Sequence, residues 1–134
     1  MKYIFFCFTV LLFLSFSGLA ARAECAYDLK GTWKGRVVDK ESGASLNVTL
    51  VIKKQSGCQV RGTLASSDGG TDTVRGRINK GKVTFNVTMT TEGCPGNLKI
   101  NATMKANNRM EFKFKISDCD GTIKGTGSLV LRSS

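Results

Sequence analysis

The acidic side chains are the residues of this sequence whose types and spacing could do chemistry. Four of the ten lie in two short polar segments, SDGGTD at positions 67–72 and SDCDG at positions 117–121. Carboxylate oxygens are the ligands that Ca²⁺ prefers, but neither segment has the spacing of a complete calcium-binding loop. The chain contains no histidine, which removes the usual general base and the imidazole metal ligand. We therefore expect a protein that is not an enzyme and that holds no metal and no cofactor.

The cysteines are the second chemically informative set, and their number depends on the start of the chain. Cys7 lies in an apolar run over residues 4–16 that follows Lys2 and precedes the Ala-Arg-Ala sequence at 21–23. This order is typical of a cleavable signal peptide. We expect residues 1–23 to be removed, and residues 24–134 to form one domain.

Removal of the signal peptide changes both the cysteine count and the charge. Four cysteines remain, which predicts two disulfides and an oxidising compartment, secreted or periplasmic. The loss of Lys2 and Arg22 takes the 20 basic residues to 18 against 10 acidic ones, a net charge of about +8 that favours anionic partners. No later segment is apolar enough to span a membrane as a helix.

Alternation of apolar and polar residues with a period of two runs through the rest of the chain and predicts strands. Gly, Asn, Asp and Ser separate these segments by turns too short for a parallel crossover, so neighbouring strands should be antiparallel. The expected strands are 31–39, 45–53, 58–66, 73–79, 82–90, 98–105, 110–117 and 122–132.

Each expected strand has one apolar face, and no amphipathic helix is available to cover it. Closure into an eight-stranded up-and-down barrel buries these faces and removes both sheet edges; a β-sandwich is the alternative. We expect the inward side chains, all apolar, to fill the barrel, with Phe85, Phe112 and Phe114 at its centre. The inward set is Trp33, Val37, Leu46, Val48, Leu50, Ile52, Val60, Leu64, Val74, Ile78, Val83, Phe85, Val87, Met89, Leu98, Ile100, Met104, Met110, Phe112, Phe114, Ile116, Ile123, Leu129 and Leu131.

The meander also predicts which cysteines pair. Cys25 and Cys58 belong to one end of the barrel, which we call the base, and Cys94 and Cys119 to the other, which we call the rim. Strands of about eight residues hold the two ends more than about 20 Å apart, whereas the Cα atoms of a disulfide lie within about 7 Å. The expected disulfides are therefore Cys25–Cys58 and Cys94–Cys119.

The Gly31-Thr32-Trp33 sequence at the start of the first strand resembles the Gly-x-Trp signature of lipocalins and the similar Gly-Thr-Trp of avidins. The resemblance, which covers this motif and the eight-strand pattern, implies a small calycin-type barrel whose tryptophan closes the base. It also implies that an arginine of the last strand, here Arg132, packs across Trp33. Strict alternation would point Arg132 outward, so this packing requires a bulge near Gly125 or Gly127.

Mapping charge onto this topology separates acids from bases. We define an acidic rim, expected as a partner-binding site, as Asp39, Glu41, Asp68, Asp72, Glu92, Asp118 and Asp120. We define a basic wall, on the outward strand positions, as Lys34, Arg36, Arg61, Arg75, Arg77, Lys113 and Lys115. Loop acids also form turns through local hydrogen bonds, and outward bases are often simply solvated, so neither set needs a function.

The sequence thus predicts an exported binding protein that uses the rim loops or the basic wall on a macromolecular partner, for example as an enzyme inhibitor or on an anionic envelope or glycan surface. No outward aromatic residues accompany the bases, which argues against single-stranded nucleic acid. The alternative is a carrier of a small apolar ligand inside the barrel, as in lipocalins. Three outward Asn-x-Thr sequons, at Asn47, Asn86 and Asn101, would accept glycans in a eukaryotic host.

Overall fold

The structure, a computed structural model, describes residue 25, residues 27–89 and residues 93–133. The proposed signal peptide, residues 1–23, lies outside the described residues. Among the described residues there is no helix of the length and hydrophobicity needed to cross a membrane. The strands are β1 (Gly31–Asp39), β2 (Ser45–Ser56), β3 (Gln59–Ser66), β4 (Thr71–Asn79), β5 (Lys82–Met89), β6 (Gly96–Lys105), β7 (Arg109–Asp118) and β8 (Gly121–Ser133).

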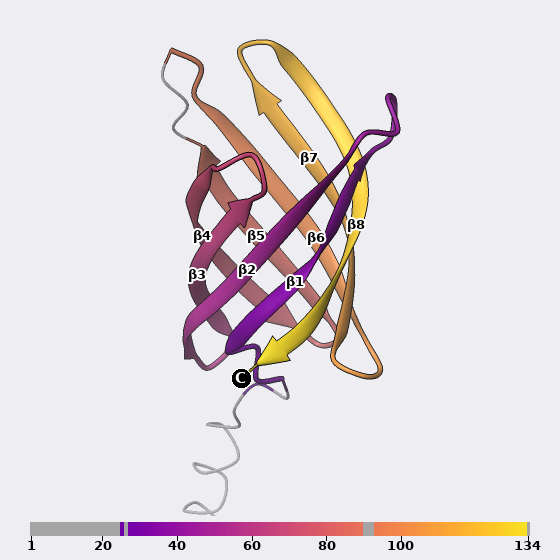
Figure 1. Ribbon diagram of the computed structural model, residues 1–134. Coiled ribbons are helices and arrows are strands. Elements are labelled where there is room, and N and C mark those ends of the chain that lie inside the picture. Colours follow the sequence, from indigo (N-terminus) through magenta and orange to yellow (C-terminus); the bar gives the residue numbers. More distant parts are fainter. Residues whose placement is uncertain (1–24, 26, 90–92, 134) are drawn as a thin grey trace, which may run out of the picture.

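The eight strands form one closed antiparallel barrel in chain order (Figure 1). Each strand pairs with the next, and β1 also pairs with β8, so that no sheet edge is left. The predicted eight-stranded meander barrel is confirmed, and the β-sandwich is wrong. Every expected strand is present, with ends that differ by no more than a few residues.

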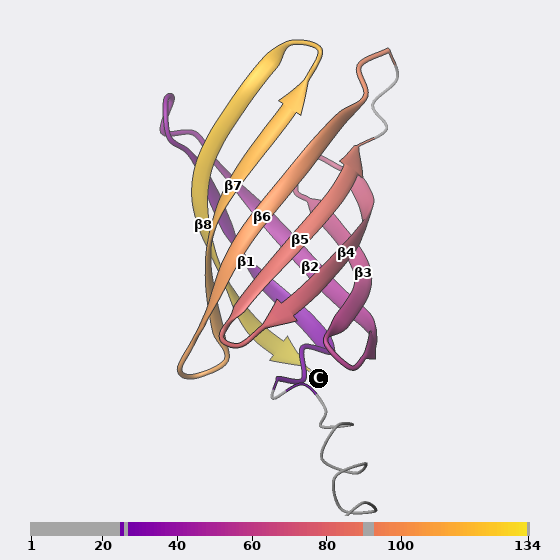
Figure 2. The same cartoon turned by 180° about the vertical axis from the view of Figure 1, so that it is seen from behind.

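The two ends of the barrel carry different turns, as Figures 1 and 2 show from opposite sides. The rim, uppermost in both views, carries the turns after β1, β3 and β7. The base carries the turns after β2, β4 and β6, together with the segment that leads into β1 and the end of β8.

Both predicted disulfides are present, one at each end. Cys25 bonds to Cys58 at the base with their Cα atoms 5.0 Å apart, and Cys94 bonds to Cys119 at the rim with their Cα atoms 5.4 Å apart. In the chain-entropy account each closes a loop whose length gives roughly 3–4 kcal/mol of stabilisation. The bonds are consistent with an oxidising compartment.

The core follows the predicted alternation with three exceptions. Leu29 and Ala102 are buried, at 1% and 2% exposure, although neither was expected in the core. Ile123 was expected inside but is 46% exposed. It lies near the start of β8 at the rim, opposite Ile116, where the strands extend past the enclosed part of the barrel and their inner face meets solvent.

Three phenylalanines pack directly over glycines on neighbouring strands. Phe114 pairs with Gly125 and Phe112 with Gly127, and Phe85 on β5 pairs in the same way with Gly76 on β4. A Cβ atom added at any of these glycines would lie within 2.8 Å of ring atoms of the facing phenylalanine. The absence of a side chain at these glycines therefore makes room for the rings.

Gly125 offers the sharpest test of this arrangement, because a Cβ atom there would also overlap the backbone oxygen of Val38. We predict that Gly125→Ala lowers the free energy of unfolding by about 1–3 kcal/mol or more, the range found for overpacked cores. Thr126→Ala, one residue along and exposed, is the control. Urea denaturation of the two variants measures the difference; equal stability would contradict the close packing.

Candidate functional site

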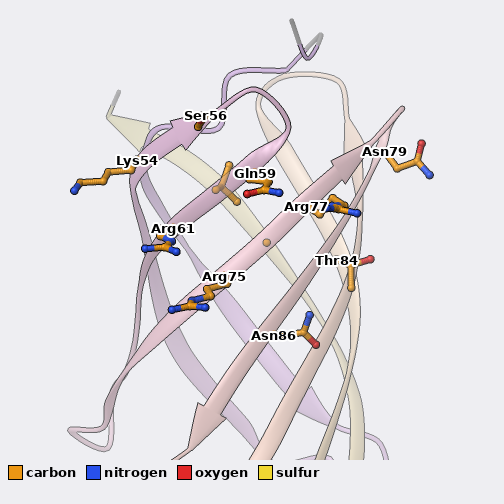
Figure 3. A pocket seen from close by; sticks show the side chains of 11 residues that line it. Lys54, Ser56, Gln59, Arg61, Arg75, Arg77, Asn79, Thr84 and Asn86 are labelled. Carbon is orange, nitrogen blue, oxygen red and sulfur yellow. The ribbon is translucent and has the colours of Figure 1, made fainter.

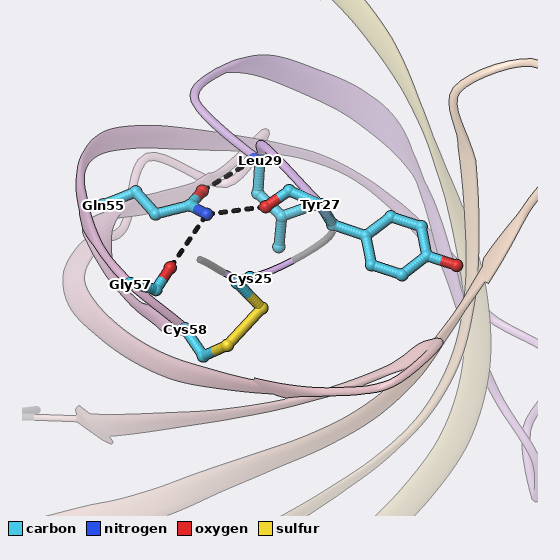
Figure 4. The surroundings of a disulfide bond; sticks show 6 residues. All are labelled: Cys25, Tyr27, Leu29, Gln55, Gly57 and Cys58. Carbon is cyan, nitrogen blue, oxygen red and sulfur yellow. Dashed lines mark hydrogen bonds between the residues drawn. A yellow bond between two sulfur atoms is a disulfide. The ribbon is translucent and has the colours of Figure 1, made fainter. Parts of the chain in front are cut away.

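The segment before β1 closes the base of the barrel (Figure 4). Trp33 is 1% exposed, and its Nε1 donates a hydrogen bond of 3.0 Å to the carbonyl oxygen of Leu29. The Gln55 side chain accepts a bond from the Leu29 amide at 2.8 Å and donates to the carbonyl oxygens of Tyr27 at 2.6 Å and Gly57 at 3.1 Å. With the Cys25–Cys58 disulfide, these bonds hold the entering chain over the base.

Gln55 reaches this position because β2 contains a bulge. The pairing of β2 with β3 shifts between Ile52 and Lys54, so one extra residue changes which side chains point inward. Lys53 and Lys54 are both exposed, and Gln55 turns inward as an intermediate residue. The residue pattern predicts a turn at Gln55, between the expected strands 45–53 and 58–66, because no residue type marks the bulge.

A second bulge lies beside Trp33, but not where the sequence analysis expected it. The pairing of β7 with β8 runs without a shift from Arg109 to Asp118, past Gly125 and Gly127. The shift occurs between β1 and β8, where Trp33 pairs with Leu131 and Thr32 with Ser133. Arg132 is the extra residue, and its side chain is exposed. The bulge predicted near Gly125 or Gly127 therefore lies instead at Arg132. The packing of the Arg132 side chain across Trp33 stays a prediction.

The rim half of the barrel contains a cavity of about 200 Å³. The expectation of a completely filled interior is therefore wrong. Phe85, Phe112 and Phe114, which were expected to fill the centre, instead form part of the cavity wall. Each ring lies close to a facing glycine. The remaining apolar lining residues are Val37, Leu46, Val48, Leu50, Leu64, Met89, Leu98, Ile100, Met110, Ile116 and Leu129.

The cavity also has a polar side, which the sequence analysis did not expect. Ser66, Asp68, Gly70 and Asp72 line it at the rim, where β3 turns into β4. Asp72 pairs with Leu64 in the β3–β4 ladder, and its side chain is of intermediate exposure. Two members of the acidic rim thus border an otherwise apolar space.

Asp68 is positioned by its own turn. Its Oδ1 accepts hydrogen bonds from the Ser66 hydroxyl and, at 3.4 Å, from the Gly70 amide. The Ser66 hydroxyl, and next the Gly70 amide, lower the pKa of the Asp68 carboxyl below its ordinary value, because both stabilise the charged form. Asp68 is therefore a carboxylate at neutral pH.

The other described acids of the rim, Asp39, Glu41, Asp118 and Asp120, do not line this cavity. Asp39 accepts bonds from the Glu41 amide at 3.0 Å and the Ser42 hydroxyl at 2.9 Å, and Asp118 accepts one from the Asp120 amide at 2.9 Å. These are the local turn-forming bonds that aspartate favours. Glu41 and Asp120 are exposed, and Glu92 lies outside the described residues.

One group of possible metal ligands occurs among the described residues. The sulfur atoms of Cys94 and Cys119 and a carboxylate oxygen of Asp120 lie within 4.8 Å of one another. The two sulfurs, however, form the rim disulfide, and a metal needs cysteine as a thiolate. These residues therefore do not suit a metal ion.

The basic wall faces solvent throughout. Its seven members, Lys34, Arg36, Arg61, Arg75, Arg77, Lys113 and Lys115, are all exposed. The sequon asparagines, Asn47, Asn86 and Asn101, are exposed on the same outer surface.

The Asp68 turn can be tested by titration. We predict that Ser66→Ala raises the pKa of Asp68 towards its ordinary value, because the variant loses the donor that most stabilises the carboxylate. Side-chain NMR titration of both proteins measures the change. Ser67 is exposed and next in the chain, so Ser67→Ala should leave the Asp68 pKa unchanged. If Ser66→Ala also leaves the Asp68 pKa unchanged, the hydrogen bond from the Ser66 hydroxyl to Asp68 is refuted.

Comparison with known proteins shows the fold. No protein-family model matches the chain, and no curated protein matches it significantly. Solved structures that match include EF1p2_mFAP2b bound to DFHBI, with a TM-score of 0.60, 18% identity, and coverage of 78% of this chain and 94% of that chain. The redesigned β-barrel b11L5F_LGL matches with a TM-score of 0.56, 20% identity and coverage of 78% and 91%.

A third match, a fluorescence-activating β-barrel designed de novo, has a TM-score of 0.54, 18% identity and coverage of 78% of this chain and 94% of its own. At these identities the likeness establishes the fold alone. The chain shares the architecture of small eight-stranded barrels, some of which bind a small molecule, and this agrees with a calycin-like barrel.

Proposed function

We propose that the mature chain is an exported binding protein that carries a small, mainly apolar molecule in the rim cavity. The observation that carries this proposal is the mainly apolar space of about 200 Å³ inside the barrel, which opens at the rim. Two barrels of the same fold, EF1p2_mFAP2b and mFAP1, are described as bound to the small molecule DFHBI. This supports the interior over the rim loops, which we had expected to receive a macromolecule.

The size of the cavity limits the ligand. An engineered protein cavity of about 150 Å³ accepts benzene, whereas pockets for drug-sized molecules start at about 300 Å³. A space of about 200 Å³ therefore suits a molecule with one or two small rings, or a short branched chain. Long fatty acids and large pigments exceed it.

The polar side of the cavity limits the ligand further. Ionised carboxylates only accept hydrogen bonds, so Asp68 and Asp72 favour a donor on the ligand. The described hydrogen bonds occupy Asp68 Oδ1 with its own turn and include none to Asp72. An apolar body with an amine or another donor at its outer end fits this arrangement, with Asp72 as its acceptor.

Blocking the cavity tests the proposal. Ile116 lines the cavity and is half-buried on β7, so Ile116→Trp should fill or cover part of the space. Lys113→Trp places the same side chain on the same strand but outside, where Lys113 is exposed. Naphthalene is the probe, followed by saturation-transfer NMR and by the melting temperature, which bound ligand raises.

We predict that naphthalene binds to and stabilises the wild type and Lys113→Trp, and that Ile116→Trp loses at least about tenfold in affinity, the equivalent of about 1.4 kcal/mol. Equal binding by both variants would place the probe outside the cavity. Absence of binding to the wild type would reject the carrier proposal.

The polar side is tested with two probes that share one ring system. We predict that 1-naphthylmethylamine binds more tightly than 1-naphthoate, by about threefold or more, since an amine can pair with a partly exposed carboxylate. Asp72→Asn should reduce this preference, whereas Asp120→Asn, which removes a rim charge away from the cavity lining, should not. Fluorescence titration measures the six affinities, two probes for each of the three proteins. A preference for naphthoate, or equal effects of the two variants, would argue against Asp72 as the acceptor.

A further inference from the structure

The register of the barrel places six cations in one continuous row across its outer surface. From β2 to β8, each residue of the row is the Cα partner of the next residue on the neighbouring strand. These residues are Lys54, Arg61, Arg75, Asn86, Lys99, Lys115 and Lys124. All seven side chains are exposed, and only Asn86 is uncharged.

This row lacks counter-charges of its own. Like charges directly opposite each other on neighbouring strands are destabilising, and Arg61 faces both Lys54 and Arg75. The one ion pair among the described residues, Arg109 with Glu111, lies outside the row. The fold therefore holds these cations side by side, where an external anion would relieve their repulsion.

The cations are densest on β2, β3 and β4, where a groove crosses the wall (Figure 3). Lys54, Arg61, Arg75 and Arg77 line it, and Arg77 lies opposite Gln59. The other polar lining residues carry hydroxyl or amide groups: Ser56, Gln59, Asn79, Thr84 and Asn86. Val60, which is 2% exposed, and Gly76 complete the lining. The groove thus combines guanidinium and ammonium groups with neutral hydrogen-bonding groups on one face.

The composition of the groove indicates the kind of anion. Neighbouring strands lie about 4.8 Å apart, so the cations repeat at a spacing that suits a chain of anionic groups better than a single ion. The described aromatic residues are buried or half-buried, which leaves no stacking platform for nucleic acid bases. The two exposed large apolar residues among those described, Val38 and Ile123, lie outside the groove lining, so no apolar anchor for a bilayer is present.

We propose that this groove binds an acidic polysaccharide. The arginines and lysines pair with its sulfate or carboxylate groups, to which guanidinium presents matched donors. The amide and hydroxyl side chains bond to its sugar hydroxyls. The groove lies on the outer wall, while the cavity opens at the rim. Binding at one therefore does not require the other, and this proposal is independent of the ligand in the barrel.

Heparin, a sulfated polysaccharide, is the probe for the experiment. The wild type is compared with Arg61→Gln/Arg75→Gln and with the control Arg36→Gln/Lys113→Gln, which removes two exposed charges from β1 and β7 instead. Both double variants have the same net charge. Asn86 lies in a sequon within the row, so the protein is produced without N-glycans.

Isothermal titration at several salt concentrations measures the affinity. We expect Arg61→Gln/Arg75→Gln to bind heparin about tenfold more weakly than the control, since each exposed charge pair contributes modestly, and wild-type binding to weaken with salt. Lys54→Gln/Arg77→Gln should reproduce the loss. Melting temperatures no lower than that of the wild type show that the variants are folded.

Three results would overturn the proposal. The first is no binding of heparin by the wild type at physiological salt. The second is an equal loss in the control, which would show that net charge alone attracts the polymer. The third is binding of anionic phospholipid vesicles or of a thymidine oligonucleotide as tightly as heparin and with the same dependence on Arg61 and Arg75, which would assign the groove to another class of partner.

Discussion

The closing pair of strands, β1 with β8, is the constraint on which the rest of the structure depends. Once β1 bonds to β8 as well as to β2, each strand has two partners, and every residue must face either the interior or the solvent. Alternation along the strands then becomes a division of the whole molecule into an apolar inside and a charged outside. Both the rim cavity and the row of cations follow from this division.

The cavity is lined by large apolar side chains, three phenylalanines among them, and by few small residues. Phe112 and Phe114 pack over Gly127 and Gly125, with their ring centroids 6.5 Å apart and the rings tilted by 53°. Both rings border the cavity towards the rim. At the base, Trp33 and Leu29 fill the corresponding space and are each 1% exposed, so the barrel is closed at one end and hollow towards the other.

The sequence predicts those features that depend on alternation and on the order of the strands. The eight strands and both disulfides belong to this class. Short turns imply antiparallel neighbours, so loops after odd-numbered strands lie at one end of the barrel and loops after even-numbered strands at the other. The loop that holds a cysteine therefore assigns that cysteine to one end. The features that it missed depend on single residues that break the alternation. The bulge before Lys54 turns Gln55 inward, and the bulge at Arg132 could not be placed from residue types. The apolar set was predicted almost completely, but the direction of each ring, and hence the cavity, depends on packing in three dimensions.

The two candidate sites are chemically separate because they occupy opposite faces of the same strands. Val74 lies in the core, while Arg75, the next residue along β4, lines the outer groove. A substitution on the outward face changes neither the volume nor the lining of the cavity, and one on the inward face leaves the row of cations in register. The acids that border the cavity lie at the rim, at the far end of β3 and β4 from Gln59 and Arg77. The proposed ligand in the barrel and the proposed polyanion on its wall would therefore use separate surfaces of the same strands.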